Sequence, residues 1–414
     1  MKAGVSQVCI TPARMVDLTG FWSRVQPATG VHDDLYARGL YLEDAGEKLL
    51  WLHCDLLGLD TDFVRRLRQR IARELGLRER QICVSATHTH SGPATQCLRG
   101  CGNVDPQYMD ELAGRLIDAA RRAVAAPENV TLWFAEGCCR LSIDRRWKWY
   151  NFTQHAHVDH VLPVLALRRQ DGGYLAVLTN YAMHNVAAGG GNRLVSADAA
   201  GAAAEMVRGQ LPGRPVVLVT NGGAGNVNPP EFGNDFAAVG RVGAKLAAAV
   251  MDTLGHLQQC EHPAIASRMQ PLRLPLIIPD REDVIWHCME MGKLSHQREF
   301  DEWCHSTLNL LEQGNVPGDI EIDLQAVRIG PASFVAIPAE VFARMAADLR
   351  AACGQHTYVA GYANGNIGYL PFREIFDEGG YEVDTAYIVY GNFMRKPEAF
   401  DLVRDAGAGM LRGM

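Results

Sequence analysis

Short apolar runs of strand length alternate with helix-length stretches along this chain, and this alternation is the feature that most limits its fold. Such an order is typical of α/β proteins rather than of chains whose strands and helices lie in separate halves. The pattern predicts strands at 5–10, 36–43, 49–54, 81–86, 130–138, 162–168, 174–181, 215–219, 322–329, 333–338 and 357–361. It predicts helices at 62–75, 106–125, 197–210, 235–254, 297–313, 340–353 and 391–405. The predicted fold class is therefore α/β.

The chain reads as one continuous domain over residues 1–414. Its length alone would allow two or three domains of ~150 residues each. However, no internal repeat, low-complexity tract or linker marks a boundary between domains. Residues 279–318 are the most polar and irregular part, and we interpret them as a helical insertion or lid. Four apolar side chains in this segment are candidates for lining a pocket: Ile285, Trp286, Met289 and Met291.

Composition and charge exclude several classes of protein. Apolar residues make up 48% and charged residues 21% of the chain, which is ordinary for a globular protein. Forty basic and 47 acidic residues give a net charge of −7, so no basic excess is present to bind nucleic acid. No charge-poor run reaches the ~18 apolar residues of a membrane-spanning helix. We expect no nucleic-acid partner and no stable membrane insertion, whereas a homo-oligomer is compatible with the sequence.

The N-terminal residues and the cysteines predict a cytoplasmic protein. The first residues contain no long apolar stretch and no cleavage pattern of a signal peptide. The 11 cysteines form no regular framework, and we expect them to be reduced thiols.

Two histidines follow the predicted strand 81–86 in the motif His88-Thr89-His90-Ser91-Gly92-Pro93. His88 and His90 are expected to continue the face of Ile82, Val84 and Ala86, because alternate residues of a strand point the same way. The carboxyl end of a strand is where α/β proteins commonly place active sites. A metal site or catalysis is the preferred reading, and a hydrogen-bonded surface pair is the alternative.

Two further strands also end in polar residues. His184 closes the apolar run 174–182 and precedes the glycines at 189–191. A lone histidine there is more often structural, but its position after a second strand repeats that of His88. The loop 220–229 is rich in glycine and carries Asn226 and Asn228, and it lacks the pattern of a phosphate-binding or dinucleotide-binding loop.

The run from residue 155 to 160 offers a competing metal site. Its sequence is His155-Ala156-His157-Val158-Asp159-His160, which matches the HxHxDH motif of the metallo-β-lactamase superfamily. In that fold a buried strand precedes the motif, whereas here the preceding residues 145–150 form no apolar strand. A dinuclear zinc hydrolase built on this run is therefore an alternative interpretation.

Three residues near the C-terminus complete the candidates. Glu340 follows the apolar run 334–339 and is expected to begin a helix. The helix dipole favours a glutamate in the first turn of a helix. Tyr369 and Tyr381 lie in glycine-containing segments. Each of the three has an ordinary structural explanation when it is considered alone.

Taken in order, these motifs resemble the catalytic domain of the neutral (alkaline) ceramidases, the non-lysosomal hydrolases of the N-acylsphingosine amide. The resemblance begins with Gly4-Val5-Ser6 and Ile10-Thr11-Pro12 and continues through Gly30–Arg38. It is most specific at His88–Pro93, and it ends in the block from Glu340 to Tyr381. It implies a single catalytic domain of mixed β-sheets flanked by helices.

The resemblance also implies a zinc site and a mechanism. The residues at the matching positions for the Zn²⁺ ligands are His88, His184, Glu340 and Tyr369. The implied activity is attack of a zinc-activated water on a linear amide of an N-acyl amine. Arg145, within Asp144-Arg145-Arg146, would face the developing oxyanion, and His90 or Tyr381 would deliver a proton to the leaving amine.

Departures from the family pattern bear on the mechanism and the substrate. The family sequence Gly-Asp-Val-Ser-Pro is Gly225-Asn226-Val227-Asn228-Pro229 here, so no hydroxyl at residue 228 can form an acyl-enzyme. The absence of an export signal and an accessory domain leads us to expect a smaller and more soluble substrate than ceramide. A non-catalytic binding protein with the same fold is a further alternative.

Overall fold

The computed structural model describes residues 1–24, 26–151, 154–291 and 297–414. The strands are β1 (Lys2–Cys9), β2 (Gly30–Val31), β3 (Tyr36–Asp44), β4 (Glu47–Cys54), β5 (Ile82–Ala86), β6 (Glu128–Cys138), β7 (Ile143–Asp144), β8 (Val161–Arg169), β9 (Tyr174–Tyr181), β10 (Leu194–Val195), β11 (Val216–Asn221), β12 (Val227–Asn228), β13 (Gln258–Gln259), β14 (Ile265–Pro275), β15 (Asp319–Ile329), β16 (Ala332–Ala336), β17 (Glu340–Val341), β18 (Thr357–Ala360) and β19 (Tyr369–Leu370). The helices are α1 (Thr61–Leu75), α2 (Pro106–Ala125), α3 (Arg145–Tyr150), α4 (Asp198–Gln210), α5 (Phe236–Leu254), α6 (Arg281–Met291), α7 (Gln297–Glu312), α8 (Arg344–Cys353), α9 (Ile375–Glu378), α10 (Tyr381–Asp384), α11 (Ala386–Val389) and α12 (Glu398–Arg412), with a 3₁₀ turn at Glu79–Gln81. Within the described residues, none of the helices combines the length and the apolar run that crossing a bilayer requires.

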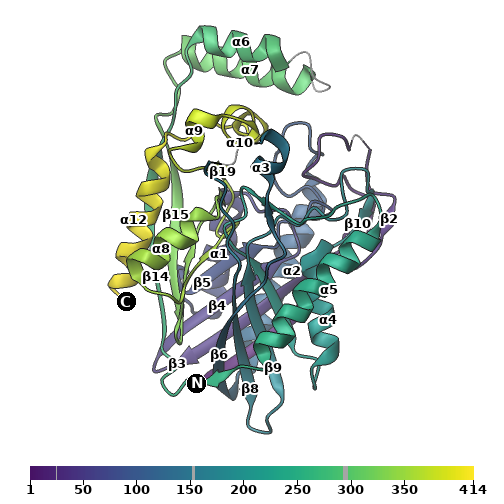
Figure 1. Ribbon diagram of the computed structural model, residues 1–414, viewed down its shortest axis with the longest axis vertical. Coiled ribbons are helices and arrows are strands. Elements are labelled where there is room, and N and C mark those ends of the chain that lie inside the picture. The colour runs from purple at the N-terminus through teal and green to yellow at the C-terminus, as the bar shows by residue number, and fades with distance from the viewer. Residues whose placement is uncertain (25, 152–153, 292–296) are drawn as a thin grey trace.

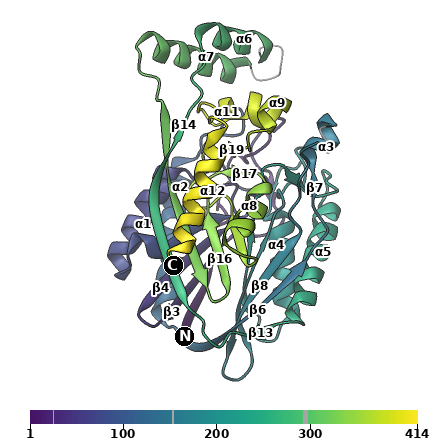
Figure 2. The same cartoon turned by 60° about the vertical axis from the view of Figure 1, so that its left-hand side comes forward.

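Two mixed sheets form the centre of the protein (Figures 1 and 2). Eight strands of the larger sheet follow the order β11-β9-β8-β6-β1-β3-β4-β5, and β13 pairs with β6. Its β4/β5 and β9/β11 pairs are parallel, and its other pairs are antiparallel. The smaller sheet has the order β14-β15-β16-β18, in which only β16/β18 is parallel. The predicted α/β class with mixed sheets and flanking helices is confirmed.

Because successive side chains of a strand point to opposite faces, the larger sheet has an apolar core on each side. Leu40 and Leu42 of β3 belong to an apolar cluster with Phe334 of the second sheet, so the two sheets pack face to face. The intervening Tyr41 points the other way and packs in a cluster with Leu116 of α2. Helices α4 and α5 cover the β8, β9 and β11 part of the same sheet, and α8 and α12 cover the smaller sheet.

Three pairs of parallel strands bring the candidate residues together. The segment after β5 carries His88 and His90, the segment after β9 carries His184, and the segment after β16 carries Glu340. Their parallel partners β4, β11 and β18 end beside them. Two of these pairs belong to the larger sheet and β16/β18 to the smaller one, and the side chains that follow their carboxyl ends converge although they are distant in sequence.

The expected helix 340–353 is wrong in its first turn. Glu340 lies in the two-residue strand β17 and pairs with Tyr369 of β19, and α8 begins only at Arg344. The tertiary pairing with β19 overrides the local preference for a helix start. Glu340 is therefore held by a strand register and not by a helix dipole.

Two other elements differ from the prediction near the C-terminus. The helix expected at 391–405 is α12, which starts at Glu398 immediately after Pro397. A proline disfavours helical geometry in the residue before it, so the helix cannot extend back to residue 391. Strand β14 (Ile265–Pro275) was not predicted, because Arg268, Gln270 and Pro271 interrupt its apolar pattern.

The segment 279–318 contains two helices, α6 and α7, between strands β14 and β15 (Figure 1). Ile285, Trp286 and Met289 are 40%, 59% and 67% exposed and are not among the residues that line the cavity beside His90 and His184, and the side chain of Met291 lies outside the described part. A disulfide joins Cys288 of α6 to Cys304 of α7, contrary to the expectation that all cysteines are reduced. The two cysteines face each other across the helix pair, which their separation of 16 residues did not reveal.

Candidate active site

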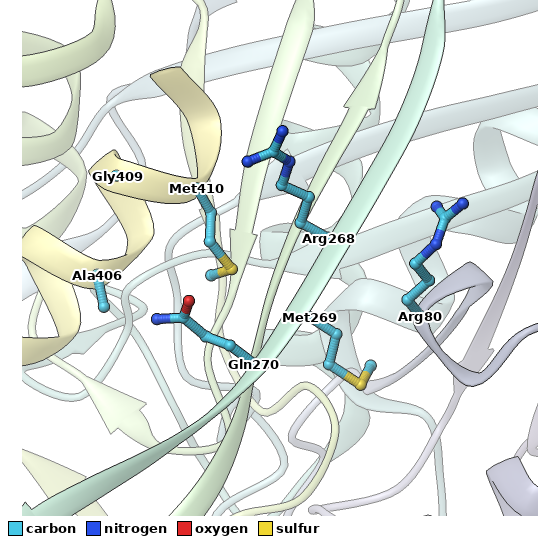
Figure 3. Close-up of a pocket in the computed structure, with 7 residues that line it drawn as sticks. All are labelled: Arg80, Arg268, Met269, Gln270, Ala406, Gly409 and Met410. Carbon is cyan, nitrogen blue, oxygen red and sulfur yellow. The ribbon is translucent and has the colours of Figure 1, made fainter. Parts of the chain in front are cut away.

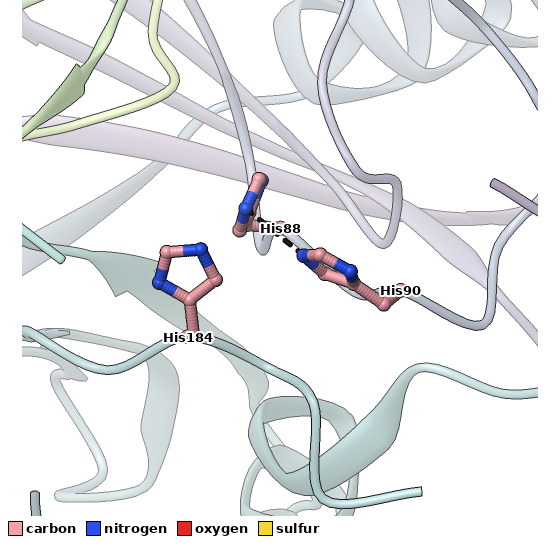
Figure 4. A group of neighbouring side chains, drawn as sticks. All are labelled: His88, His90 and His184. Atoms are coloured by element: carbon pink, nitrogen blue, oxygen red, sulfur yellow. Dashed lines mark hydrogen bonds between the residues drawn. The ribbon is translucent and has the colours of Figure 1, made fainter. Parts of the chain in front are cut away.

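Three buried imidazoles converge on one point (Figure 4). One ring nitrogen from each of His88, His90 and His184 lies within 4.8 Å of the others. The opposite nitrogen, Nδ1, contacts a backbone carbonyl in each case: Leu57 for His88 at 2.8 Å, Ala224 for His184 at 2.6 Å and Gly20 for His90 at 2.9 Å. Since a carbonyl can only accept, each Nδ1 carries the hydrogen, and each Nε2 presents a lone pair.

The local backbone, rather than a regular strand, sets these ring positions. Strand β5 ends at Ala86, and His88 has a φ of 65°, in the left-handed region. The expectation that His88 and His90 extend the strand face is therefore wrong, although both rings still point inward. Gly20 has a φ of 96°, and a side chain there would clash with the His90 ring. A glycine is required for its carbonyl to reach His90.

Glu340 completes the group from the opposite side. Its Oε2 lies 3.2 Å from Nε2 of His88 and 3.1 Å from Nε2 of His184, and the side chain is buried. The hydroxyl of Tyr390 donates to Oε1 at 2.5 Å, and that of Tyr362 approaches Oε2 at 3.5 Å. The carboxylate is therefore fixed with one oxygen toward the two imidazoles.

The electrostatics of this group favour a bound cation. Burial by itself raises the pKa of Glu340, but His88 and His184 together lower it well below its ordinary value. Burial, Arg145 and His88 lower the pKa of His184 to about 4. An ionised carboxylate and imidazoles whose Nε2 atoms are directed at one point form a ligand set suited to a divalent metal such as zinc. Among the described residues, His88, His90 and His184 are the one group of three histidine, cysteine or acidic side chains whose ligand atoms all lie within 4.8 Å of one another.

The structure places Tyr369 beside this group. Tyr369 is the register partner of Glu340, it is buried, and its ring makes edge contacts with Tyr381 at 5.7 Å and Tyr390 at 6.5 Å between centroids. Burial raises the pKa of Tyr369 well above its ordinary value. Tyr369 would therefore need a metal or the nearby Arg145 to become a phenolate.

A buried ion-pair network positions Arg145. Its guanidinium lies 3.3 Å from Nε2 of His184 through Nη1 and 5.3 Å from the ring centre of Tyr369. Nε of Arg145 donates to Oε1 of Glu382 at 2.9 Å, and Nη1 of Arg146 donates to Oε2 of the same carboxylate at 2.6 Å. Glu382 is fully buried, so this single carboxylate holds two guanidinium groups and directs one toward the histidines.

A cavity of about 330 Å³ opens onto this group. Its polar lining consists of His90, Arg145, His184, Asn228, Tyr369 and Tyr381. Its apolar lining includes Phe21, Trp22, Val186 and Phe232. Five of the seven residues that the family resemblance assigns to the site line this cavity: His90, Arg145, His184, Tyr369 and Tyr381. The other two are buried behind it: His88 contacts His90 and His184, and Glu340 contacts His184.

The run 155–160 does not form a second metal site in the described part of the chain. Asp159 makes a two-bond ion pair with Arg350 at 2.9 and 3.0 Å. The backbone N–H of His157 donates to Asp144, and the ring of His155 makes an edge contact with Phe372. The structure therefore gives no support to the dinuclear alternative.

Sequence reasoning missed four contributors to the site: Tyr362, Tyr390, Arg146 and Glu382. No spacing or motif marks the two tyrosines, which reach Glu340 only through the fold. Arg146 and Glu382 are adjacent to the predicted residues Arg145 and Tyr381. Two neighbouring arginines and a glutamate beside predicted site residues are the signal that could have suggested a buried ion pair.

Another cavity, of about 370 Å³, lies beside β14 and the C-terminal half of α12 (Figure 3). Arg80 and Arg268 line it, but Arg80 donates to the carbonyl of Ser267 at 2.9 Å and Arg268 donates to the carbonyl of Gly413. None of the candidate site residues belongs to this cavity.

Comparisons with known proteins agree with the geometry. Residues 2–126 match the family described as neutral/alkaline non-lysosomal ceramidase, N-terminal. Neutral ceramidases of Drosophila pseudoobscura pseudoobscura and Drosophila melanogaster are 23% and 24% identical over 258 residues, which is 56% of this chain and 36% of each relative. The neutral ceramidase structure from Pseudomonas aeruginosa superposes with a TM-score of 0.79 at 19% identity, covering 99% of this chain and 74% of that one. The structure of a ceramidase complexed with C2 gives 0.80 at 18%, covering 100% and 75%.

The chain resembles the neutral/alkaline ceramidases, in sequence over residues 2–126 and in fold over nearly its whole length. The resemblance seen in the sequence motifs is thereby confirmed. The chain spans about a third of the length of the curated ceramidases that it matches, 36% in each case. The likeness to the solved ceramidases covers nearly the whole chain and establishes its fold.

The hydrogen bond from Tyr390 to Glu340 generates a first prediction for this site. Tyr390→Phe removes the donor to Oε1 and should weaken Zn²⁺ binding by roughly 10- to 100-fold, as is common when a partner of a metal ligand is lost. The dissociation constant can be measured by competition with a chromogenic chelator. Tyr387→Phe is the matched control, because the Tyr387 hydroxyl lies 3.3 Å from His287 and has no contact with Glu340. Equal zinc affinity in both variants would contradict the assigned role.

Proposed function

We propose that this protein is a zinc-dependent hydrolase of linear amides of the N-acyl amine type. The observation that carries the proposal is the buried set of His88, His184 and Glu340 beside a cavity lined by both polar and apolar side chains. Tyr369, the register partner of Glu340, is the proposed fourth ligand, and His90 lies close enough to assist. A zinc ion in this set supplies Lewis acidity and lowers the pKa of a coordinated water to roughly 7.

The protein residues around the cavity divide the remaining tasks. Arg145 is a permanent cation in the wall, so it can donate to the carbonyl oxygen as negative charge develops there. Glu382 holds it in that position. Tyr381 lines the same cavity and carries a hydroxyl proton that it can give to the leaving amine. His90 is less suited to this step, because its Nδ1–H is committed to Gly20 and its Nε2 faces His88.

No side chain is required to form a covalent intermediate. Strand β12 carries Asn228 at the cavity wall, and a carboxamide cannot form an acyl-enzyme. The proposed reaction is therefore direct hydrolysis in which the scissile carbon receives a water oxygen and the amine leaves with the delivered proton.

Zinc analysis of His88→Ala tests the proposal. Wild-type protein should contain about one tightly bound zinc per chain and cleave members of an N-acyl amine panel. The variant should lose zinc and at least about 100-fold in kcat/KM, because a ligand with a fixed tautomer is removed. The double variant His155→Ala, His157→Ala is the control and should retain both. Full zinc occupancy in His88→Ala, or its loss in the control, would overturn this ligand set.

The size of the cavity generates a prediction about substrate length. Its volume of about 330 Å³ lies at the low end of the range for small-molecule sites, and Phe21, Trp22 and Phe232 bound it. Short N-acyl amines should therefore exceed long-chain ceramide in kcat/KM, measured in detergent with a series of increasing acyl length. Long-chain ceramide as the best substrate of the series would contradict the size argument while leaving the zinc-dependent amide hydrolysis intact.

A further inference from the structure

Asn228 presents a buried hydrogen-bond acceptor with no partner in the described part of the protein. The side chain is 4% exposed and lines the cavity, yet its Oδ1 receives no hydrogen bond. Most buried polar atoms in proteins are paired, and one left unpaired is costly and calls for an explanation such as a ligand.

The backbone places this acceptor among the reacting groups. Asn228 is in β12, which pairs with β7 so that Asn228 is opposite Ile143, two residues before Arg145. The carbonyl of Val227, the preceding residue, accepts the backbone N–H of His184 at 2.9 Å. Asn228 therefore lies between the segment that carries a proposed zinc ligand and the segment that carries the proposed oxyanion donor.

The hydrogen-bonding capacities of the cavity match a secondary amide. Such an amide presents one acceptor, its carbonyl oxygen, and one donor, its N–H. Arg145 has only donors and suits the carbonyl oxygen, whereas Oδ1 of Asn228 has only acceptor capacity and suits the N–H. The ring nitrogens of His90 and His184 that face the site are occupied with His88, Glu340 and Arg145.

We propose that Asn228 accepts a hydrogen bond from the N–H of the scissile amide and makes the site selective for secondary amides over esters. This inference rests on the proposed function. An ester carries an oxygen where the amide carries N–H, so its lone pairs face those of Oδ1 and the acceptor stays unpaired. The serine that the family pattern has at this position is less restrictive, because a hydroxyl can either donate or accept.

A matched substrate pair tests the proposal with the zinc-loaded protein. The probes are an N-octanoyl alkylamine and the octanoate ester of the corresponding alcohol, which differ only in N–H against oxygen. Asn228→Ala should lower kcat/KM for the amide by about 10-fold and change that for the ester by less than about 2-fold. Asn228→Ser should raise the ester rate relative to the amide rate. Val186→Ala is the control, since it alters the same cavity without a hydrogen-bonding group and should affect both substrates in parallel.

The outcomes separate this inference from the function on which it rests. An amide-to-ester ratio unchanged in both Asn228 variants, with zinc content and melting temperature retained, overturns the role of Asn228 alone. A loss in Asn228→Ala that appears only when the amine half carries a hydroxyl group would assign the acceptor to that hydroxyl and overturn the N–H assignment. Wild-type protein that cleaves neither probe overturns the proposed function as well.

Discussion

The site depends on the hydrogen bonds that three imidazole N–H groups donate to backbone carbonyls. His88, His90 and His184 each donate from Nδ1 to a carbonyl, and each is then obliged to present Nε2 inward. The carbonyls of Leu57 and Ala224 belong to segments that follow β4 and β11. The tautomers of His88 and His184 are therefore set by segments that follow the parallel strand pairs of the larger sheet. A ligand set fixed in this way loses little conformational entropy when it binds a metal ion.

Burial of charge is the second constraint, and it joins distant parts of the chain. Glu382 follows Tyr381 in α10, and it pairs with Arg145 and Arg146 of α3. Removing one partner of a buried ion pair typically costs about 3–5 kcal/mol, because the other charge remains without compensation. The network therefore fixes α3 against α10 and keeps one guanidinium next to His184. The carboxylate of Glu382 therefore holds Arg145 in the position from which, in the proposed reaction, it would stabilise charge on a substrate.

Sequence reasoning predicted the strand framework and the members of the site better than it predicted their local geometry. The order of the motifs identified His88, His184 and Glu340, which the fold brings into contact. The alternate-face argument for His88 and His90 failed, because a residue with positive φ after β5 has no period-two pattern. Glu340 was expected in a helix, since pairing with a strand 29 residues later leaves no local trace. The hydroxyl of Tyr390, which donates to Glu340, could not be predicted from a sequence position that resembles any packed aromatic residue.

The most direct test of the account is zinc K-edge X-ray absorption on the purified protein. The buried ligand set predicts a spectrum of nitrogen and oxygen ligands only, at about 2.0–2.1 Å, with the multiple-scattering features of imidazole. In His184→Ala the imidazole contribution should fall or the metal should be lost. A sulfur ligand near 2.3 Å, or an imidazole signal that is unchanged in His184→Ala, would contradict the assignment of the metal to this site.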